Sequence, residues 1–226
     1  MPESQKIAVI AGASGYLGRA ISQSLSAADY LVIALDRSSG YDLTDQELLL
    51  NKAQAVANLG RIDLLIFAAA APLVRKKLLD LSIDEFNSQL NVNLLGAYNF
   101  YKAFVPYLHA ESQLMAITTE ALESGQGIVK SGSYLPAKAG LRAMLRSLAS
   151  DLAELSIGVT AIAPGFMPGG LNADLGTTGL AIISAKSGAT MTSPEQVSEL
   201  ILKLATRKLE ATGKSIALPG LVITDL

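Results

Sequence analysis

The sequence predicts one α/β domain built on a doubly wound parallel sheet, with helices on both faces so that the domain has three layers. Three observations predict it. Short apolar runs of strand length alternate with longer amphipathic segments. The short runs are apolar on both faces, as strands must be when helices bury them from each side. A glycine-rich turn joins the first apolar run to the first helical segment, which is typical of a Rossmann-type domain.

The 226 residues contain no linker, repeat or low-complexity stretch, so we expect a single domain over residues 1–226. The runs expected to form strands are residues 7–10, 31–35, 64–67, 114–117, 159–162 and 216–218. Apolar residues at three-and-four spacing predict helices over residues 19–28, 44–59, 83–109, 137–155 and 194–209. Residues 169–192, rich in Gly, Thr and Ser, lack periodicity and are expected to form a flap over a substrate site.

Composition excludes several classes of function. Lys and Arg (18) nearly balance Asp and Glu (20), so no electrostatic footprint for nucleic acid is present. The chain has no cysteine and one histidine, so we expect no disulfide and no metal site. No apolar stretch has the length of a membrane span, and the first residues do not resemble a signal peptide. We therefore expect a cytoplasmic protein with neither a nucleic-acid nor a membrane partner.

The glycine turn directly follows the first predicted strand and leads into a helix. Its residues are Gly12, Ser14, Gly15, Tyr16, Leu17 and Gly18. Such a turn brings backbone N–H groups and the positive end of a helix against a pyrophosphate, and the glycines leave room for the anion. The alternative is that the glycines only permit a tight turn and close helix packing. The context on both sides favours dinucleotide binding.

An acidic residue, Asp36, ends the second predicted strand at the spacing expected of the residue that hydrogen-bonds an adenosine ribose. This favours NAD over NADP, because a 2′-phosphate would meet Asp36 as a like charge. Arg37 keeps NADP open, since its guanidinium can pair with a 2′-phosphate or stack on adenine.

Tyr134 and Lys138 stand four residues apart at the start of the fourth predicted helix, which places both side chains on one face. A nearby ammonium stabilises phenolate, so we expect Lys138 to lower the pKa of Tyr134. A tyrosine tuned in this way can give a proton to a carbonyl oxygen or take one from an alcohol. The spacing alone is common by chance.

Taken together, these residues resemble the short-chain dehydrogenase/reductase family in its compact single-domain form. Residues 79–96 are similar to the segment that carries the family's active-site asparagine, here Asn93. Residues 158–165 resemble the strand and Pro-Gly turn that face the nicotinamide, here Pro164 and Gly165. Asp42 and Leu43 resemble the acid and apolar residue that flank the adenine.

The resemblance implies a role for each residue of the site. Tyr134 is expected to be the general acid/base, Lys138 to bind the nicotinamide ribose, and Asn93 to hold a water that relays protons to Lys138. At the position where the family has a serine that orients the substrate carbonyl, this sequence has no serine. Thr119 is our choice for it, because a threonine hydroxyl donates the same hydrogen bond, with Thr118 or Ser133 as alternatives.

Other departures lie where the cofactor is expected. The polar Asn-Asn-Ala-Gly of the family is replaced by Phe67 and three alanines, Ala68, Ala69 and Ala70, which are expected to line the adenosine pocket without polar braces. The threonine that contacts the carboxamide is missing near Gly169, so backbone groups such as that of Met167 are expected to take this contact.

Two charged features have simpler interpretations. His109 is expected near a helix C-terminus, where it needs no catalytic role. Residues 75–77 form the longest basic run, interpreted as a solvated surface, with contact to an anionic substrate or cofactor as the alternative. The resemblance also implies a homo-oligomer, a dimer or a tetramer.

The sequence thus predicts an oxidoreductase that transfers hydride between NAD, or else NADP, and a small carbonyl or secondary alcohol substrate. The alternative is a non-catalytic nucleotide-binding or regulatory protein that retains the fold. A sugar-nucleotide epimerase, suggested by the glycine spacing, lacks chain for a substrate domain after Pro164.

Overall fold

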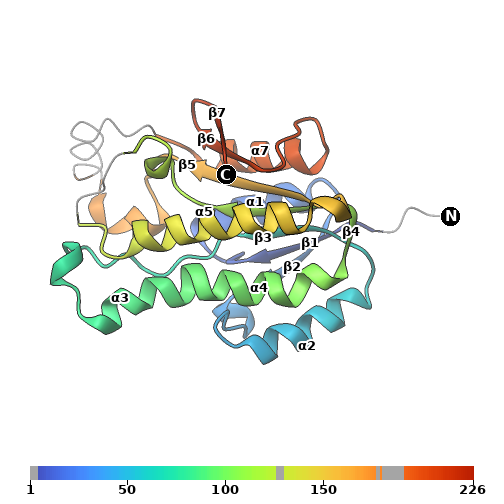
Figure 1. Ribbon diagram of the computed structural model, residues 1–226, viewed down its shortest axis with the longest axis horizontal. Helices are drawn as coiled ribbons and strands as arrows, with labels where there is room; N and C mark the ends of the chain where they lie inside the picture. The colour runs from blue at the N-terminus through green and yellow to red at the C-terminus, as the bar shows by residue number, and fades with distance from the viewer. Residues whose placement is uncertain (1–4, 126–129, 177–178, 180–190) are drawn as a thin grey trace.

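A computed structural model describes residues 5–125, 130–176, 179 and 191–226. One seven-stranded sheet has the order β2-β1-β3-β4-β5-β6-β7 (Figure 1). All neighbouring strands are parallel except β6 and β7. The strands are β1 (Ile7–Ala11), β2 (Leu31–Leu35), β3 (Ile62–Phe67), β4 (Leu108–Ile117), β5 (Gly158–Pro164), β6 (Lys214–Leu218) and β7 (Val222–Asp225).

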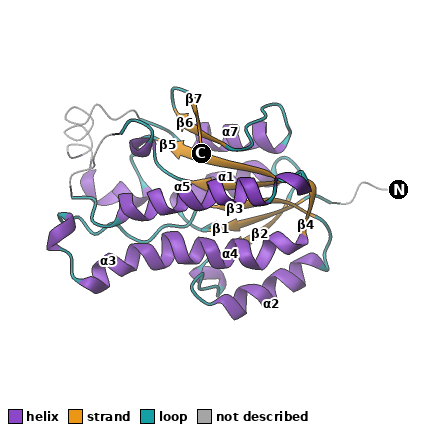
Figure 2. Ribbon diagram, in the orientation of Figure 1, coloured by secondary structure: helices purple, strands orange, loops and turns teal. Residues whose placement is uncertain are grey.

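Helices cover both faces of this sheet, as the sequence predicts (Figure 2). They are α1 (Tyr16–Ser26), α2 (Gln46–Ala57), α3 (Ile83–Leu90), α4 (Gly96–Phe104), α5 (Tyr134–Asp151) and α7 (Pro194–Ala205). Alternate residues of the strands feed two separate apolar cores. Val9 packs with α2, α4 and α5 on one face, and its neighbour Ile10 packs with α1 and α7 on the other. Burial on both faces explains why apolar and polar residues do not alternate along the strands.

The expected single helix over residues 83–109 is wrong. The helical path contains a π-helical stretch, Asn91–Leu95, between α3 and α4. It ends at Phe104 and a short 3-10 turn that contains Pro106, which cannot continue a helix interior. His109 therefore lies in β4 and not at a helix end, and its Nε2 is 3.4 Å from Asp63 Oδ1. The short antiparallel strand β7, with exposed residues such as Val222, was not expected either.

The strand order places the candidate site. Chain connections run in opposite directions on the two sides of β1 and β3, and ligands of open α/β sheets bind at the carboxyl ends of strands at such a switch point. Gly12 follows β1 and Ala68 follows β3, so both stand at this point. Within the described ranges no strand lies outside β2, which is one edge of the sheet. No described helix combines the length and apolar character needed to cross a membrane.

Candidate active site

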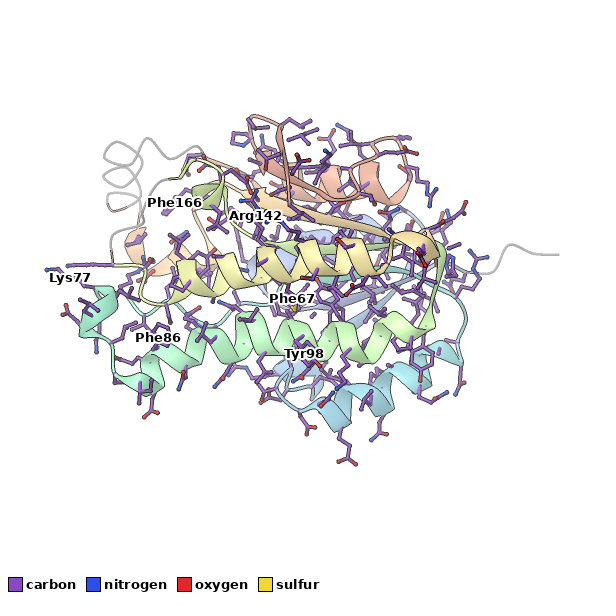
Figure 3. All side chains as sticks on the ribbon, viewed as in Figure 1. Phe67, Lys77, Phe86, Tyr98, Arg142 and Phe166 are labelled. Atoms are coloured by element: carbon purple, nitrogen blue, oxygen red, sulfur yellow. The ribbon has the colours of Figure 1, made fainter. Side chains whose placement is uncertain are left out.

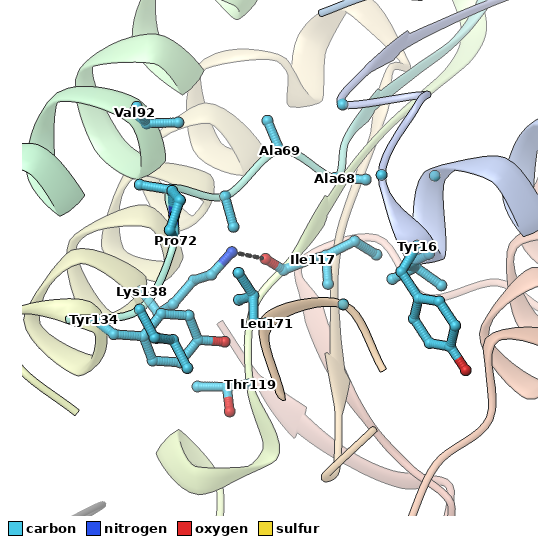
Figure 4. Close-up of a pocket in the computed structure, with 18 of the residues that line it drawn as sticks. Tyr16, Ala68, Ala69, Pro72, Val92, Ile117, Thr119, Tyr134, Lys138 and Leu171 are labelled. Atoms are coloured by element: carbon cyan, nitrogen blue, oxygen red, sulfur yellow. Dashed lines mark hydrogen bonds between the residues drawn. The ribbon is translucent and has the colours of Figure 1, made fainter. Parts of the chain in front are cut away.

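A cleft of about 1570 Å³ opens along the carboxyl ends of the strands. Every residue that the sequence analysis expects to contact a cofactor lines it, from the glycine turn to Met167. Thr119, Tyr134 and Lys138 line the same cleft, and Figure 4 shows them grouped beside the end of β4. Asn93 is buried and does not line it. The structure thus brings the predicted cofactor and catalytic residues together, with Asn93 behind the wall.

Close backbone contacts explain the glycines of the turn. Gly12 has a φ of +84°, and a Cβ at this position would lie 2.6 Å from Ala69 Cα. A Cβ at Gly18 would lie 2.0 Å from the Gly12 carbonyl oxygen. Both distances are too short for any side chain. The glycines therefore hold α1 tightly against β1 and β3.

The beginning of α1 offers backbone donors to the cleft. Gly15 is the N-cap and its position provides no side-chain acceptor, and the first turn of α1 contains no acidic residue. Ser14, Gly15 and Tyr16 are exposed there. Helix N-terminal N–H groups without acceptors and without neighbouring acids fit a phosphate anion. A Cβ at Gly12 or Gly18 would clash with the backbone, and Gly15 and Tyr16 at the start of α1 line the cleft. The residues of this turn therefore fit the pyrophosphate of a dinucleotide.

Asp36 directly follows β2 and is held by hydrogen bonds. Its Oδ2 accepts from the Ser14 N–H at 2.9 Å, and its Oδ1 accepts from the Ser39 N–H at 3.0 Å and from the Ser38 hydroxyl. Burial alone would raise the pKa of Asp36, but these hydrogen bonds outweigh it and lower the pKa to about 2. Asp36 is therefore ionised at neutral pH, and the exposed Arg37 stands next to it in the cleft wall.

The segment after Asp36 forms the far end of the cleft. Asp42 Oδ1 accepts from both the N–H and the hydroxyl of Thr44, each at 2.8 Å, and these bonds lower the pKa of Asp42. Leu43 is buried, and its carbonyl oxygen accepts from Asn99 Nδ2 at 3.2 Å. An acid and an apolar side chain fixed in this way fit an adenine-binding wall.

The alanine segment after β3 is braced from behind. Asn93 Oδ1 accepts from the Ala71 N–H at 3.0 Å, and Asn93 Nδ2 donates to Gln89 Oε1 at 2.7 Å. Gln89 also donates to the Pro72 carbonyl oxygen. The sequence analysis missed Gln89, which supplies part of the bracing that the three alanines cannot. Both polar atoms of the Asn93 side chain take part in this brace. The expected role of Asn93 in holding a water stays a prediction.

Tyr134 and Lys138 share one face of α5 and point into the cleft (Figure 4). Lys138 Nζ lies 5.8 Å from the centre of the Tyr134 ring and donates to the Ile117 carbonyl oxygen at 2.7 Å. Thr119, two residues after the end of β4, lies beside the Tyr134 hydroxyl in Figure 4. These three side chains converge on one point of the cleft.

The expectation that Lys138 lowers the pKa of Tyr134 is wrong, because the pKa of Tyr134 is raised. Burial raises the pKa of Tyr134 to about 12, and the Thr119 hydroxyl, which lowers it, offsets only part of the rise. Burial also lowers the pKa of Lys138 to about 8. Desolvation disfavours the charged form of each group, and at this separation it outweighs their mutual stabilisation. Tyr134 is therefore a protonated donor at neutral pH.

The alternatives to Thr119 are engaged elsewhere. The Thr118 hydroxyl donates to the Ile162 carbonyl oxygen at 3.2 Å. The Ser133 hydroxyl donates to the Phe86 carbonyl oxygen at 2.8 Å, and Ser133 does not line the cleft. Among the three, the geometry favours Thr119.

A segment after β5, residues 169–175 and called the strap below, lines the cleft with residues 169–172. A Cβ at Gly169 would lie 2.7 Å from the Tyr16 ring, so the strap rests on this tyrosine at the cofactor end. Met167, just before it, is partly buried, and its carbonyl oxygen accepts from Asn172 Nδ2 at 3.0 Å. Of the expected flap over residues 169–192, residues 177–178 and 180–190 lie outside the described residues.

Arg75 fastens the other side of the strap. Its Nε and Nη2 contact the two carboxylate oxygens of Asp174 at 2.7 and 2.8 Å, and Nη2 also donates to the Leu171 carbonyl oxygen at 3.0 Å. The expected solvated surface holds for Lys76 and Lys77, which are exposed. Arg75 differs, because this pairing with a distant residue holds it partly buried in the cleft wall. Lys76 instead pairs with Glu85 at 2.5 Å.

Comparison with known proteins adds three findings. The family model described as enoyl-(acyl carrier protein) reductase matches residues 38–218. A 3-oxoacyl-(acyl carrier protein) reductase, FabG, from Buchnera aphidicola subsp. Baizongia pistaciae is 30% identical over 195 residues, which cover 77% of this chain and 79% of that protein. The solved Pseudomonas aeruginosa RhlG/NADP active-site complex has a TM-score of 0.83 at 24% identity and covers 96% of each chain.

A small-chain dehydrogenase solved in complex with NADPH has a TM-score of 0.79 at 19% identity, covering 96% of this chain and 98% of the other. At these identities the two solved structures show that the whole fold is shared. The relationship beyond the fold rests on the two sequence matches, to the family model and to FabG.

Proposed function

Because the chain belongs to the short-chain dehydrogenase/reductase family of oxidoreductases, we propose that it interconverts a carbonyl compound and a secondary alcohol with a nicotinamide cofactor. Tyr134 acts as the general acid/base. The observation that carries the proposal is that Thr119, Tyr134 and Lys138 converge in the cleft that begins at the Gly12 turn. A protein without catalysis has no need for this convergence.

The residues proposed to hold the cofactor all line one cleft, which supports their assignment. The N–H groups at the start of α1 bind the pyrophosphate, and Asp36 stands beside the adenosine ribose. Lys138 lies at the nicotinamide end. When bound, the cofactor supplies or accepts the hydride that this chain's own side chains cannot provide.

The protein's part in the reaction is proton transfer and orientation. In reduction, the Thr119 hydroxyl and the Tyr134 hydroxyl both donate hydrogen bonds to the substrate oxygen. As hydride reaches the carbonyl carbon, the Tyr134 O–H bond breaks and its proton passes to that oxygen, which yields the alcohol. A pKa of about 12 keeps the proton on Tyr134 at neutral pH, so Tyr134 is in the form that donates a proton in carbonyl reduction. The Thr119 hydroxyl, whose hydrogen bond lowers the pKa of Tyr134, stabilises the phenolate that remains.

We propose NAD as the preferred cofactor. Asp36 is ionised, and a carboxylate beside the adenosine ribose would repel a 2′-phosphate. The neighbouring Arg37 and the NADP held by the RhlG structure keep NADP as the competing choice. The experiment is calorimetric titration of the purified protein with NADH and, separately, NADPH. Tighter binding of NADH supports this choice, and tighter binding of NADPH reverses it.

Turnover separates this proposal from the alternative of a non-catalytic nucleotide-binding protein. A panel of small ketones and 3-oxo esters is assayed with the cofactor that binds, by loss of absorbance of the reduced nicotinamide. Reduction of a carbonyl supports the enzyme. Tight cofactor binding without turnover of any compound favours the regulatory alternative.

We propose that the chain forms a homo-oligomer through α4. Leu95 precedes this helix and is 46% exposed, and Tyr98, labelled in Figure 3, lies on the helix and is 47% exposed. A face of this kind is typical of a subunit interface. Leu95→Glu is expected to lower the mass measured by light scattering, and an unchanged mass argues against this face.

A further inference from the structure

A buried carboxylate, Glu123, lies outside the chemistry described so far. Its side chain is 5% exposed. Oε1 accepts from the Ser215 hydroxyl and Oε2 from the Thr224 hydroxyl, each at 2.6 Å. Oε2 is also 3.1 Å from Arg142 Nη2. Ser215 and Thr224 stand opposite each other on β6 and β7, so the two strands present adjacent hydroxyls to one carboxylate.

Glu123 belongs to the turn that begins at Thr119. Thr119 is the N-cap of the 3-10 turn Glu120–Leu122. Its carbonyl oxygen accepts from the Leu122 N–H at 3.1 Å, and the Glu123 N–H donates to the Glu120 carbonyl oxygen at 2.9 Å. A carboxylate fixed at the end of this turn therefore fixes the turn itself, and with it the direction in which Thr119 leaves β4.

The same carboxylate is tied to the helix that carries Tyr134. Arg142 follows Lys138 by four residues on α5, so Tyr134, Lys138 and Arg142 share one helical face. Arg142 is labelled in Figure 3, and its Nη2 also donates to the Asp225 carbonyl oxygen at 2.9 Å. Glu123 thus connects the turn after Thr119 to the helix of the proposed acid.

Stability alone is a poor explanation for this arrangement. The desolvation of two charges commonly cancels their attraction, so a buried ion pair contributes little compared with apolar residues of the same shape. Arg142 Nε is buried and has no hydrogen-bond partner among the described residues, so the guanidinium is not fully satisfied even with Glu123 present. What the cluster does provide is a fixed geometry between three segments.

We propose that Glu123 is a positioning residue that holds the Thr119 hydroxyl in register with Tyr134, by anchoring the turn after Thr119 to Arg142, Ser215 and Thr224. The expected effect of Glu123 on turnover rests on the proposed function. The anchor itself is a property of the fold and can be measured without turnover.

The test combines a kinetic double-mutant cycle with hydrogen exchange. Glu123→Gln keeps the shape of the side chain and removes its charge, and Thr119→Val removes the hydroxyl. We expect Glu123→Gln to lower kcat about tenfold and to leave the NADH dissociation constant unchanged. In the Thr119→Val background the same change is expected to have no further effect on kcat, because the hydroxyl that Glu123 positions is already gone.

Amide exchange measures the anchor directly in the intact protein. Glu123→Gln is expected to speed exchange of the Leu122 and Glu123 amides about tenfold or more and to leave those of α7 unchanged. Glu199→Gln, at an exposed glutamate that pairs with Lys203 on α7, is the matched control and should change neither kcat nor this exchange.

Three outcomes overturn the proposal: unchanged exchange at Leu122 and Glu123, an unchanged kcat despite faster exchange, or losses in kcat that multiply in the double variant. A wild-type protein that binds NADH and reduces no carbonyl removes the proposed function and the kinetic role of Glu123 with it. The exchange result then still decides whether the anchor exists.

Discussion

The ammonium of Lys138 donates a hydrogen bond to the Ile117 carbonyl oxygen at 2.7 Å while the lysine is only 2% exposed. This bond ties α5 to the last residue of β4, so the helix that carries Tyr134 and the strand that leads to Thr119 are joined inside the cleft wall. It keeps a charged group where solvent is largely excluded. The contact has consequences for both stability and catalysis.

Stability should rise with pH above neutrality because of Lys138. Burial lowers its pKa to about 8 in the folded protein, below the value of about 10.4 of an unfolded lysine, so the unfolded state binds more protons between these values. The free energy of unfolding is expected to increase by about 2 kcal/mol from about pH 7 to about pH 9.5. Urea unfolding followed by circular dichroism measures it.

Lys138→Met is the control for this rise, since methionine fills a similar volume and does not titrate. The slope should disappear in this variant. Above about pH 10 the raised pKa of Tyr134 acts in the opposite direction, because the unfolded tyrosine loses its proton first. A wild-type stability that stays flat up to about pH 9.5 would mean that Lys138 is solvated.

Tyr134→Phe should lower kcat by about a hundredfold or more, because it removes the proton donor and leaves the ring that packs in the cleft. Cofactor binding, measured by calorimetry, should stay within about twofold of wild type. Tyr107→Phe, at a tyrosine that bonds Gln54 outside the cleft lining, is the matched control for loss of a tyrosine hydroxyl and should retain full turnover. Full activity of the Tyr134 variant removes this residue from the mechanism.

Asp36→Asn should shift the ratio of NADH to NADPH affinity toward NADPH by about tenfold, because it removes the charge that opposes a 2′-phosphate. Asparagine has one acceptor oxygen, which can keep the bond from the Ser39 N–H while the bond from the Ser14 N–H is lost. The backbone bond from the Tyr41 N–H to the Asp36 carbonyl oxygen still closes the turn, so the turn is expected to persist. Calorimetry with each cofactor gives the ratio. The comparison variant is Asp45→Asn, whose residue caps α2 outside the cleft lining. Equal ratios in the two variants would refute the ribose contact.

Asp174→Asn should loosen the strap by breaking its paired contact with Arg75. Both the association and the dissociation rate of NADH are expected to rise about threefold or more, while the dissociation constant changes less. Stopped-flow fluorescence of NADH measures both rates. The partly exposed pair contributes little to global stability, so the thermal midpoint should hardly move. Unchanged rates would show that ligands pass without displacing the strap.

Features set by neighbouring residues were predictable from the sequence. The Gly12 turn, the position of Asp36 and the shared face of Tyr134 and Lys138 each depend on short spacings that secondary structure converts directly into geometry. The apolar runs predict the parallel sheet for the same reason, since burial on both faces leaves a local pattern.

Contacts between distant residues were not predictable. Arg75 pairs with a partner 99 residues away, and Glu123 with hydroxyls 92 and 101 residues away. No local pattern indicates which arginine or glutamate meets which partner. The raised pKa of Tyr134 depends on burial, which the Tyr134 to Lys138 spacing does not reveal. Strand β7 is short and exposed, so it carries no periodic signal.

The early end of the sheet at β2 has a practical consequence for redesign. Since no described strand lies beyond it, the segment from Asp36 to Thr44 lines this end of the cleft. This segment is closed by its own bonds, from Asp36 to Ser39 and from Asp42 to Thr44, and Asn99 attaches it to α4. Exchanging this segment as a unit, with its contacts to Ser14 and Asn99 kept, is therefore a route by which nucleotide preference can be changed while the sheet and the reacting side chains stay untouched.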